Sequence, residues 1–139
     1  QLIQKAVGYL DSLAREGEGD VLLRHDLAGA YSALARVQGF PIWAHSGSQA
    51  KALENYRKAN SILESLQAAD PNDREIRYGL GIGYGDYALS LAPSSAAQSL
   101  EMHRRALDVI QGFANADPDR REPRCPAVEA DARAGRSAR

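Results

Sequence analysis

The stretch that decides the fold is 52-ALENYRKANSILESLQAADPND-73. Its apolar residues recur at steps of three and four, which places them on one stripe of an α-helix; they are Ala52, Tyr56, Ala59, Leu63 and Leu66. Pro71 cannot continue this helix, and it biases Asp70 away from helical backbone. Asn72 is then expected to cap a second helix, with Glu75 as its reciprocal partner. The stretch therefore predicts a helix, a tight turn and another helix.

Two kinds of helix alternate along the chain. The pattern KAxxILxxL that begins at Lys58 returns 47 residues later as RAxxVIxxF, and an earlier copy, KAxxYLxxL, lies 53 residues before it. Between these copies, Leu27-x-x-x-Tyr31 returns as Leu80-x-x-x-Tyr84. Two helix types that alternate at a nearly constant period are typical of a helical-repeat array.

We therefore predict an all-α fold, a helical-repeat array of about five helices within residues 1–118. The expected helices span residues 1–15, 21–37, 48–69, 73–91 and 95–116. Asp20 is the expected N-cap of the second helix, whose buried stripe is predicted to be Leu23, Leu27, Ala30, Tyr31 and Leu34. Ser95 and Gln98 form a capping-box pattern before the last helix. Residues 119–139 carry many arginines and few large apolar residues, so we expect a disordered or frayed tail.

Composition excludes several classes of function. The 139 residues fit one domain, and 44% apolar with 25% charged residues is ordinary for a globular chain. A net charge of −1 gives no electrostatic reason to expect nucleic acid as a partner. No apolar run approaches the roughly 20 residues that span a bilayer. The chain starts inside a helical pattern, so we expect a piece of a longer protein, on either side of a membrane.

The sequence shows no catalytic or cofactor motif. His25, His45 and His103 have no metal-ligand spacing, and the single cysteine, Cys125, lies in the expected tail. The glycine-rich stretch 79-GLGIGYG-85 lacks the preceding strand and the glycine order of a nucleotide-binding loop. We therefore expect no enzymatic activity, no metal and no cofactor. Each of these glycines costs about 0.8–1 kcal/mol in a helix interior, so close helix contact or local mobility must account for them.

The connection between the second and third helices carries the only tryptophan, Trp43, with Phe40 and Ile42 nearby. Two interpretations stay open. These side chains fold back over the helix pair as a lid, or Trp43 is an exposed apolar contact for a partner.

The two helix types resemble the tetratricopeptide repeat. Its first helix carries Leu-Gly/Ala-x-x-Tyr, which matches Leu27-Ala28-x-x-Tyr31 and 80-LGIGY-84. Its second helix carries Ala-x-x-x-Tyr/Phe-x-x-Ala, which matches 52-ALENYRKA-59, and a proline follows at positions 71 and 118. The period here exceeds the usual 34 residues, and His103 stands where the family has an aromatic residue.

A narrower resemblance rests on the phrases 9-YLDSLA-14 and 37-VQGFP-41. They are similar to the C-terminal repeat region of acidobacterial-type bacterial serine/threonine protein kinases. The chain contains no kinase catalytic motif, so the resemblance implies a regulatory or sensory part of such a kinase rather than its catalytic domain.

The resemblance to the tetratricopeptide repeat also implies a binding groove, because the first helix of each pair lines the concave side. The positions that would face it are His25, Gly29, Ser32, Tyr78, Ile82 and Asp86. We therefore expect a non-catalytic module that binds a peptide or a partner's helix. A small-ligand-binding helical domain and a structural spacer or dimerisation module are the alternatives. Apolar faces on the first and last helices also predict self-association into a homo-oligomer.

Overall fold

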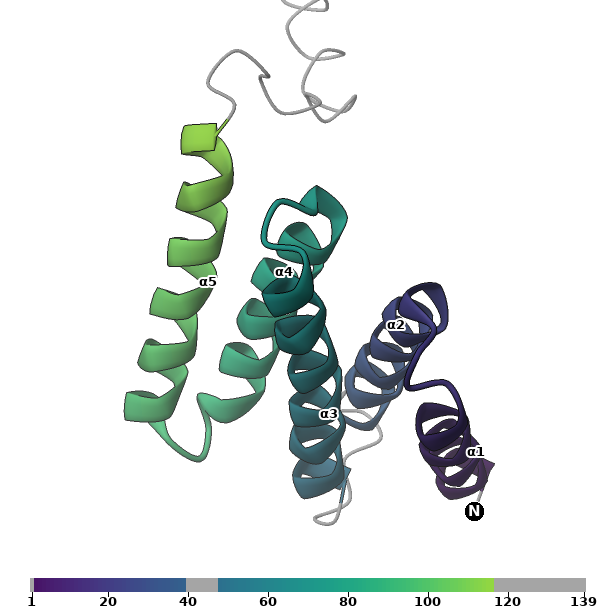
Figure 1. Ribbon diagram of the computed structural model, residues 1–139. Coiled ribbons are helices and arrows are strands. Elements are labelled where there is room, and N and C mark those ends of the chain that lie inside the picture. The colour runs from purple at the N-terminus through teal and green to yellow at the C-terminus, as the bar shows by residue number, and fades with distance from the viewer. Residues whose placement is uncertain (1, 40–47, 117–139) are drawn as a thin grey trace, which may run out of the picture.

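The structure, a computed structural model, describes residues 2–39 and 48–116. This part of the chain forms helices and contains no strand, so the predicted all-α class is confirmed. The helices are α1 (Leu2–Glu16), α2 (Val21–Gly39), α3 (Ser48–Ala69), α4 (Arg74–Leu91) and α5 (Ala96–Ala116) (Figure 1). They begin and end within two residues of the expected ranges. Trp43 and the expected tail, 119–139, lie outside the described residues.

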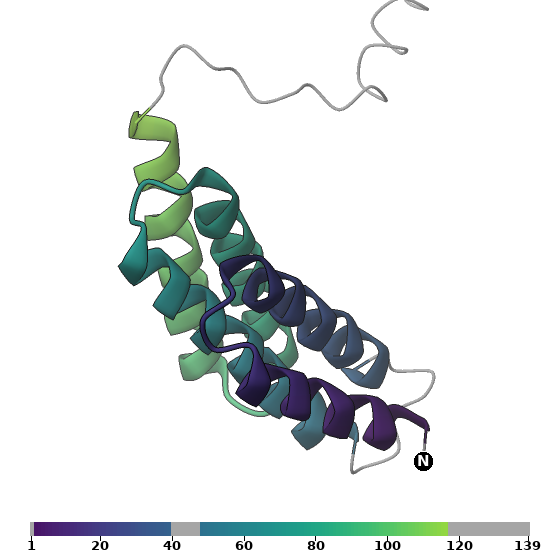
Figure 2. The same ribbon diagram turned by 45° about the vertical axis from the view of Figure 1, so that its right-hand side comes forward.

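The helices run alternately up and down, and each packs against the next one along the chain (Figures 1 and 2). The backbones of α2 and α4 also approach each other. Over the described residues, the backbone of α3 does not come equally close to that of α1 or to that of α5. Thus α2 and α4 form an inner pair that runs in one direction. The helix α3 runs in the opposite direction and packs against both of them.

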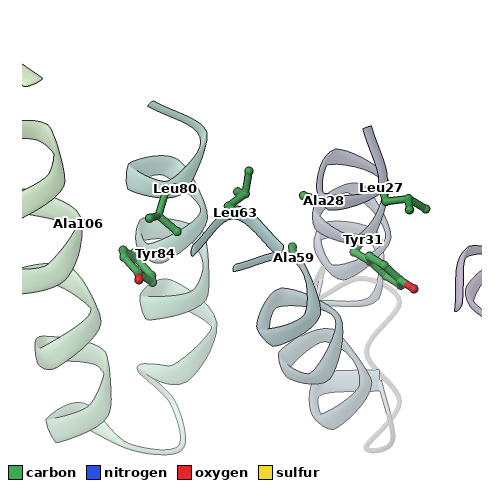
Figure 3. Close-up of a cluster of buried hydrophobic side chains, with 8 residues drawn as sticks. All are labelled: Leu27, Ala28, Tyr31, Ala59, Leu63, Leu80, Tyr84 and Ala106. Atoms are coloured by element: carbon green, nitrogen blue, oxygen red, sulfur yellow. The ribbon is translucent and has the colours of Figure 1, made fainter. Parts of the chain in front are cut away.

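The central helix α3 is buried along the stripe predicted from its sequence. The exposed fractions of its five apolar residues are all 5% or less: Ala52, Tyr56, Ala59, Leu63 and Leu66. Figure 3 shows Leu63 and Ala59 between α2 and α4, in one cluster with Leu27, Ala28, Tyr31, Leu80, Tyr84 and Ala106. Each large apolar side chain in such a cluster contributes about 1.5–3 kcal/mol to folding relative to an exposed one.

The buried face of α2 differs in part from the predicted stripe. Leu27 and Tyr31 are buried as expected, but Leu23, Ala30 and Leu34 are only half-buried. Small residues that the prediction omitted are buried instead, namely Ala28 and Ala35. The reason is that α2 packs against α1, α3 and α4, and the side chains next to α3 and α4 are small enough for close contact.

Side-chain caps stand at the starts of α2, α4 and α5. The prediction from the sequence was wrong by one residue for the cap of α4. The Asp20 carboxylate accepts the backbone N–H of Leu23 at 3.0 Å, as expected for an N-cap. The cap of α4 is Asp73, whose Oδ1 accepts the N–H of Ile76 at 3.0 Å, and not Asn72. The backbone N–H of Asn72 instead donates to Oδ1 of Asp70 within the turn. Before α5, the Ser95 hydroxyl accepts the N–H of Gln98 at 3.3 Å.

Close helix contact accounts for two of the four glycines in the middle of α4, Gly81 and Gly83, whereas Gly79 has room for a methyl group at ordinary van der Waals distance. A Cβ added at Gly83 would overlap the side-chain oxygen of Asn60, and one added at Gly81 would lie 3.0 Å from Cγ1 of Ile110. At Gly79 an added Cβ would lie 3.8 Å from both methyl groups of Leu63. At Gly85 it would meet no atom of the described residues within 4 Å, so no contact explains that glycine.

A contact between an acid, a tyrosine and a base joins α1, α2 and α3. The Tyr31 hydroxyl donates to Oδ1 of Asp11 at 2.5 Å, and Nζ of Lys58 lies 2.8 Å from the same oxygen. Nζ of Lys58 also lies 5.5 Å from the centre of the Tyr31 ring. Burial, the hydrogen bond and the charge of Asp11 all raise the pKa of Tyr31 above its usual value.

The tyrosine–carboxylate hydrogen bond recurs between α3 and α4, with an arginine of α5 nearby. The Tyr84 hydroxyl donates to Oε1 of Glu64 at 2.6 Å. Burial and then this hydrogen bond raise the pKa of Tyr84, while the nearby guanidinium of Arg105 opposes the rise. The three residues occupy the positions of Asp11, Tyr31 and Lys58 in the next copies of the sequence pattern. The hydrogen bond from tyrosine to carboxylate is therefore repeated in the same register, whereas Arg105 pairs with Glu101 of its own helix at 3.2 Å.

Candidate functional site

A groove lies between α2 and α4, on the side of this pair that faces away from most of α3. Its volume is about 340 Å³, and Leu63 of α3 reaches its floor between the two walls (Figure 3). The residues that line it recur every three or four positions along both inner helices, so one helical face of each forms a wall. They are His25, Ala28, Gly29, Ser32, Arg36, Leu63, Glu75, Tyr78, Gly79, Ile82, Gly83 and Asp86.

The structure brings all six positions that the repeat predicted to face a groove to this one groove. His25 and Ser32 lie on the α2 wall, and Tyr78, Ile82 and Asp86 lie on the α4 wall. Gly29, the remaining groove position inferred from the repeat, lines it as well. Their role in binding stays a prediction. Trp43, the separate candidate for a contact with a partner, lies outside the described residues.

Sequence reasoning missed two charged residues of the groove. Arg36 follows Ser32 by four positions, and Glu75 precedes Tyr78 by three positions, so each extends its wall by one helical turn. The helical spacing alone could have identified both of them. The predicted positions on each wall came from the repeat consensus, which does not include the next helical turn on either wall.

The middle of the groove presents large apolar surface to solvent. Tyr78 is 62% exposed and Ile82, one turn further along α4, is 43% exposed, whereas Leu63 below them is 5% exposed. Single exposed apolar side chains are normal on a protein surface, but neighbouring ones in a concave site mark a place where other molecules bind.

Charged side chains stand at both ends of the groove. At one end, Nη1 of Arg36 lies 4.0 Å from Oδ2 of Asp86, with 59% and 27% of these side chains exposed. An ion pair so exposed contributes about 0–1 kcal/mol and opens easily. At the other end stands Glu75, whose carboxylate makes no hydrogen bond or ion pair within the described part of the chain.

A buried tyrosine lies beneath the Arg36–Asp86 end. Tyr56 is 3% exposed, and its burial and the charge of Asp86 raise its pKa, with a hydrogen bond to Ser90 and the charge of Arg36 acting in the opposite direction. The Tyr56 hydroxyl is therefore neutral at physiological pH. The Arg36–Asp86 ion pair carries no net charge.

A second, smaller cavity lies between α1, α2 and α3. Its volume is about 160 Å³, and it is lined by Gln4, Val7, Gln38, Lys51, Glu54 and Asn55. Nδ2 of Asn55 donates to Oε1 of Gln38 at 2.7 Å, and both side chains are buried. This hydrogen bond pairs one donor and one acceptor of the lining.

Within the described ranges, no group of three or more histidine, cysteine, aspartate or glutamate side chains stands close enough to hold a metal ion. None of the five helices is both long and apolar enough to cross a membrane, as judged over the same residues.

Comparisons of the chain with protein-family models, with curated proteins and with solved structures gave no match.

Proposed function

We propose that this chain is a non-catalytic helical-repeat module, resembling the tetratricopeptide repeat, that binds a segment of a partner protein in the groove between α2 and α4. One observation carries the proposal. Residues selected on two separate helices, 53 positions apart in the sequence pattern, line one groove with exposed apolar side chains at its centre. A groove with an apolar centre and polar ends suits recognition of a peptide segment.

The repeated tyrosine–carboxylate hydrogen bond supports the repeat interpretation. A repeat array is stabilised by each unit's contacts with its neighbours, so equivalent junctions are expected to reuse the same interactions. The Tyr31–Asp11 and Tyr84–Glu64 hydrogen bonds are such a pair, at 2.5 and 2.6 Å. They lie at positions that the sequence pattern makes equivalent.

The exposure of the groove favours a protein segment over a small ligand. Pockets for small molecules bury most of the ligand surface and have volumes of about 300–1,000 Å³. The groove is at the low end of this range, at about 340 Å³, and its main apolar residues are 62% and 43% exposed. A small molecule here would stay largely in water, whereas a longer segment could cover both walls.

The test is selection of binding peptides from a random display library against the full 139-residue chain. We expect the selected peptides to bind Ile82→Asp at least tenfold more weakly, because the charge must be desolvated in the apolar centre of the groove. The matched control is Leu107→Asp, which places the same charge at a similarly exposed apolar residue on α5. Peptides that bind both variants like the wild type would contradict the proposal.

The kinase resemblance extends the proposal to the parent protein, of which this chain would be the C-terminal regulatory or sensory part. The support is limited to the phrases at 9–14 and 37–41. Sequencing the gene on both sides tests it directly. A kinase catalytic domain upstream is the expected result, and further repeats with no catalytic domain would remove the kinase from the proposal.

A further inference from the structure

We propose that the segment bound in the groove is an amphipathic helix of about three turns that lies antiparallel to α2 and α4 and carries a lysine or arginine in its last turn. The inference rests on the proposed function and specifies its ligand. Four features of the groove support it: the length of its walls, the small residues along them, the common direction of α2 and α4, and the carboxylate of Glu75.

The length of the walls sets the length of the helix. The groove runs from His25 to Arg36 on α2 and from Glu75 to Asp86 on α4. Eleven residue steps at 1.5 Å give each wall a length of about 16 Å, or three turns. An amphipathic helix of the same length presents about three apolar side chains at i, i+4 and i+7 to such a groove. Tyr78 and Ile82, one turn apart, are the exposed apolar surface that these side chains would cover.

Small residues let the backbone of a helix come close to both walls. Ala28 and Gly29 line the groove on α2, and Gly79 and Gly83 line it on α4. A Cβ at Gly29 would meet no atom of the described residues within 4 Å, so the space above this residue is open to a ligand. Packed helices have axes about 8–10 Å apart, and small residues at the contact permit the shorter distances.

The direction of the inner helices sets the direction of the bound helix. Because α2 and α4 run the same way, the positive ends of both helix dipoles lie at the His25 and Glu75 end of the groove (Figure 2). The negative C-terminal end of a bound helix is stabilised there. The described helix α3 already packs against the pair in this antiparallel manner from the other side.

Charge complementarity then selects the basic residue. Glu75 has no ionic partner in the described part of the chain, whereas Arg36 and Asp86 at the opposite end pair with each other. A lysine or arginine is favoured in the last turn of a helix by the helix's own dipole. In the antiparallel orientation this basic residue lies at the Glu75 end, where it meets the free carboxylate.

The test uses three synthetic peptides of about 15 residues, acetylated and amidated, and fluorescence anisotropy with the full chain. The first has leucines at i, i+4 and i+7 and a lysine in its last turn. The second keeps this composition but moves the lysine to the first turn. The third has the first sequence with a central proline, which opposes helix formation by about 3 kcal/mol.

We expect the first peptide to bind best, the second about threefold more weakly, and the proline peptide at least tenfold more weakly. Glu75→Lys should abolish the preference for the first peptide over the second, and Glu16→Lys, an exposed position on α1, should leave this preference unchanged. Both the variants and the wild type are to be compared by circular dichroism, so that loss of folding is recognised.

Three results would overturn the inference. Equal binding of the proline peptide would mean that the groove holds an extended segment. Indifference to the position of the lysine, or to Glu75→Lys, would remove the antiparallel orientation. A third result is that no model peptide binds, although library peptides bind the wild type and lose affinity for Ile82→Asp. In that case the proposal of a helical ligand is wrong and the proposed function stands. If library peptides are also insensitive to Ile82→Asp, the proposed function fails with it.

Discussion

The side chain of Asn60 on α3 packs against Gly83 on α4. The Asn60 side chain is 4% exposed, and its Nδ2 donates to the backbone oxygen of Gly83 at 3.3 Å. Its Oδ1 has no hydrogen-bond partner among the described residues. A buried amide is costly to displace, because a lost hydrogen bond leaves polar atoms without partners. A glycine is therefore needed at position 83, because any larger residue would occupy the space of the Asn60 side chain.

Substitution of two glycines in α4 should change the free energy of unfolding in opposite directions. Gly85→Ala should stabilise the protein by up to about 1 kcal/mol, because alanine is the better helix former and the site has open space. Gly83→Ala should destabilise it by about 1–2 kcal/mol, because the new methyl group overlaps Oδ1 of Asn60. Urea unfolding of both variants measures the difference, and equal stability of the two would contradict this account.

At the scale of single residues, sequence reasoning recognised that the glycines need an explanation but could not supply the partner. Asn60 lies on another helix, and nothing in the local sequence of α4 indicates which side chain stands opposite each glycine. The groove positions were easier to predict, because helical spacing places Tyr78, Ile82 and Asp86 on one face. The same spacing would have added Arg36 and Glu75.

The tyrosine–carboxylate hydrogen bonds connect each inner helix to the helix before it in the chain. Tyr31 of α2 reaches Asp11 of α1, and Lys58 of α3 joins the same carboxylate. Each contact thus fixes the position of an inner helix against that neighbour. The wall of the groove on α2 depends on the first contact, and the wall on α4 depends on the second.

The raised pKa of Tyr31 predicts that stability falls in alkaline solution. A tyrosine in the unfolded chain ionises near pH 10, whereas folded Tyr31 retains its proton to higher pH. Its contribution is therefore complete below about pH 10 and is lost as the pH rises above it. Urea unfolding from pH 8 to 11 should show a flatter decline for Tyr31→Phe than for the wild type. Tyr9→Phe, at a 65% exposed position, is the control and should decline like the wild type.

Asp11 should make a small contribution in the acid range. Burial alone would raise its pKa, but hydrogen bonds from Lys58 and Tyr31 and the nearby positive charges outweigh this effect and lower it. The contribution is present above about pH 4, where the unfolded side chain ionises, and is lost as the pH falls through the folded value. Because the side chain is 40% exposed, we expect less than about 1 kcal/mol.

The measurement for Asp11 is thermal unfolding of Asp11→Asn and the wild type between pH 7 and pH 2. The melting temperature of the variant should be lower at pH 7, and the gap should close as the pH falls below 4. Asp26→Asn, at an exposed position on α2, serves as the control. A gap of constant size across this range would show that the ionised carboxylate is not the stabilising group.

At the scale of elements, a helix was predictable where its whole apolar stripe is present in the sequence. The α3 stripe repeats over four turns, so its burial followed from periodicity alone. The cap of α4 was misplaced by one residue, because Asn72 and Asp73 are both good capping residues and only the path of the turn selects Asp73. The α2 stripe was partly wrong because that helix contacts three others.

At the scale of the whole molecule, large apolar residues stay partly exposed along α5. Leu100, Leu107 and Ile110 are 52%, 55% and 46% exposed and lie at helical spacing. We expect the chain to self-associate at high protein concentration through such surface. Leu107→Lys should reduce the mean mass measured by light scattering, with Lys51→Arg as a control that leaves the surface unchanged in charge. A wild type that stays monomeric at every concentration would contradict the expectation.

The register of the tyrosine–carboxylate contacts also gives the row of helices a polarity. Lys5 of α1 is in register with Lys58 and Arg105, so a helix pair engineered in front of α1 would find the base already in place for its own tyrosine and carboxylate. On α5 the register position of Asp11 and Glu64 is Gln111, a neutral amide. A pair fused behind α5 would lack the carboxylate that accepts the tyrosine hydroxyl in both existing contacts. Lengthening by design is therefore easier at the amino-terminal side than at the carboxyl-terminal side.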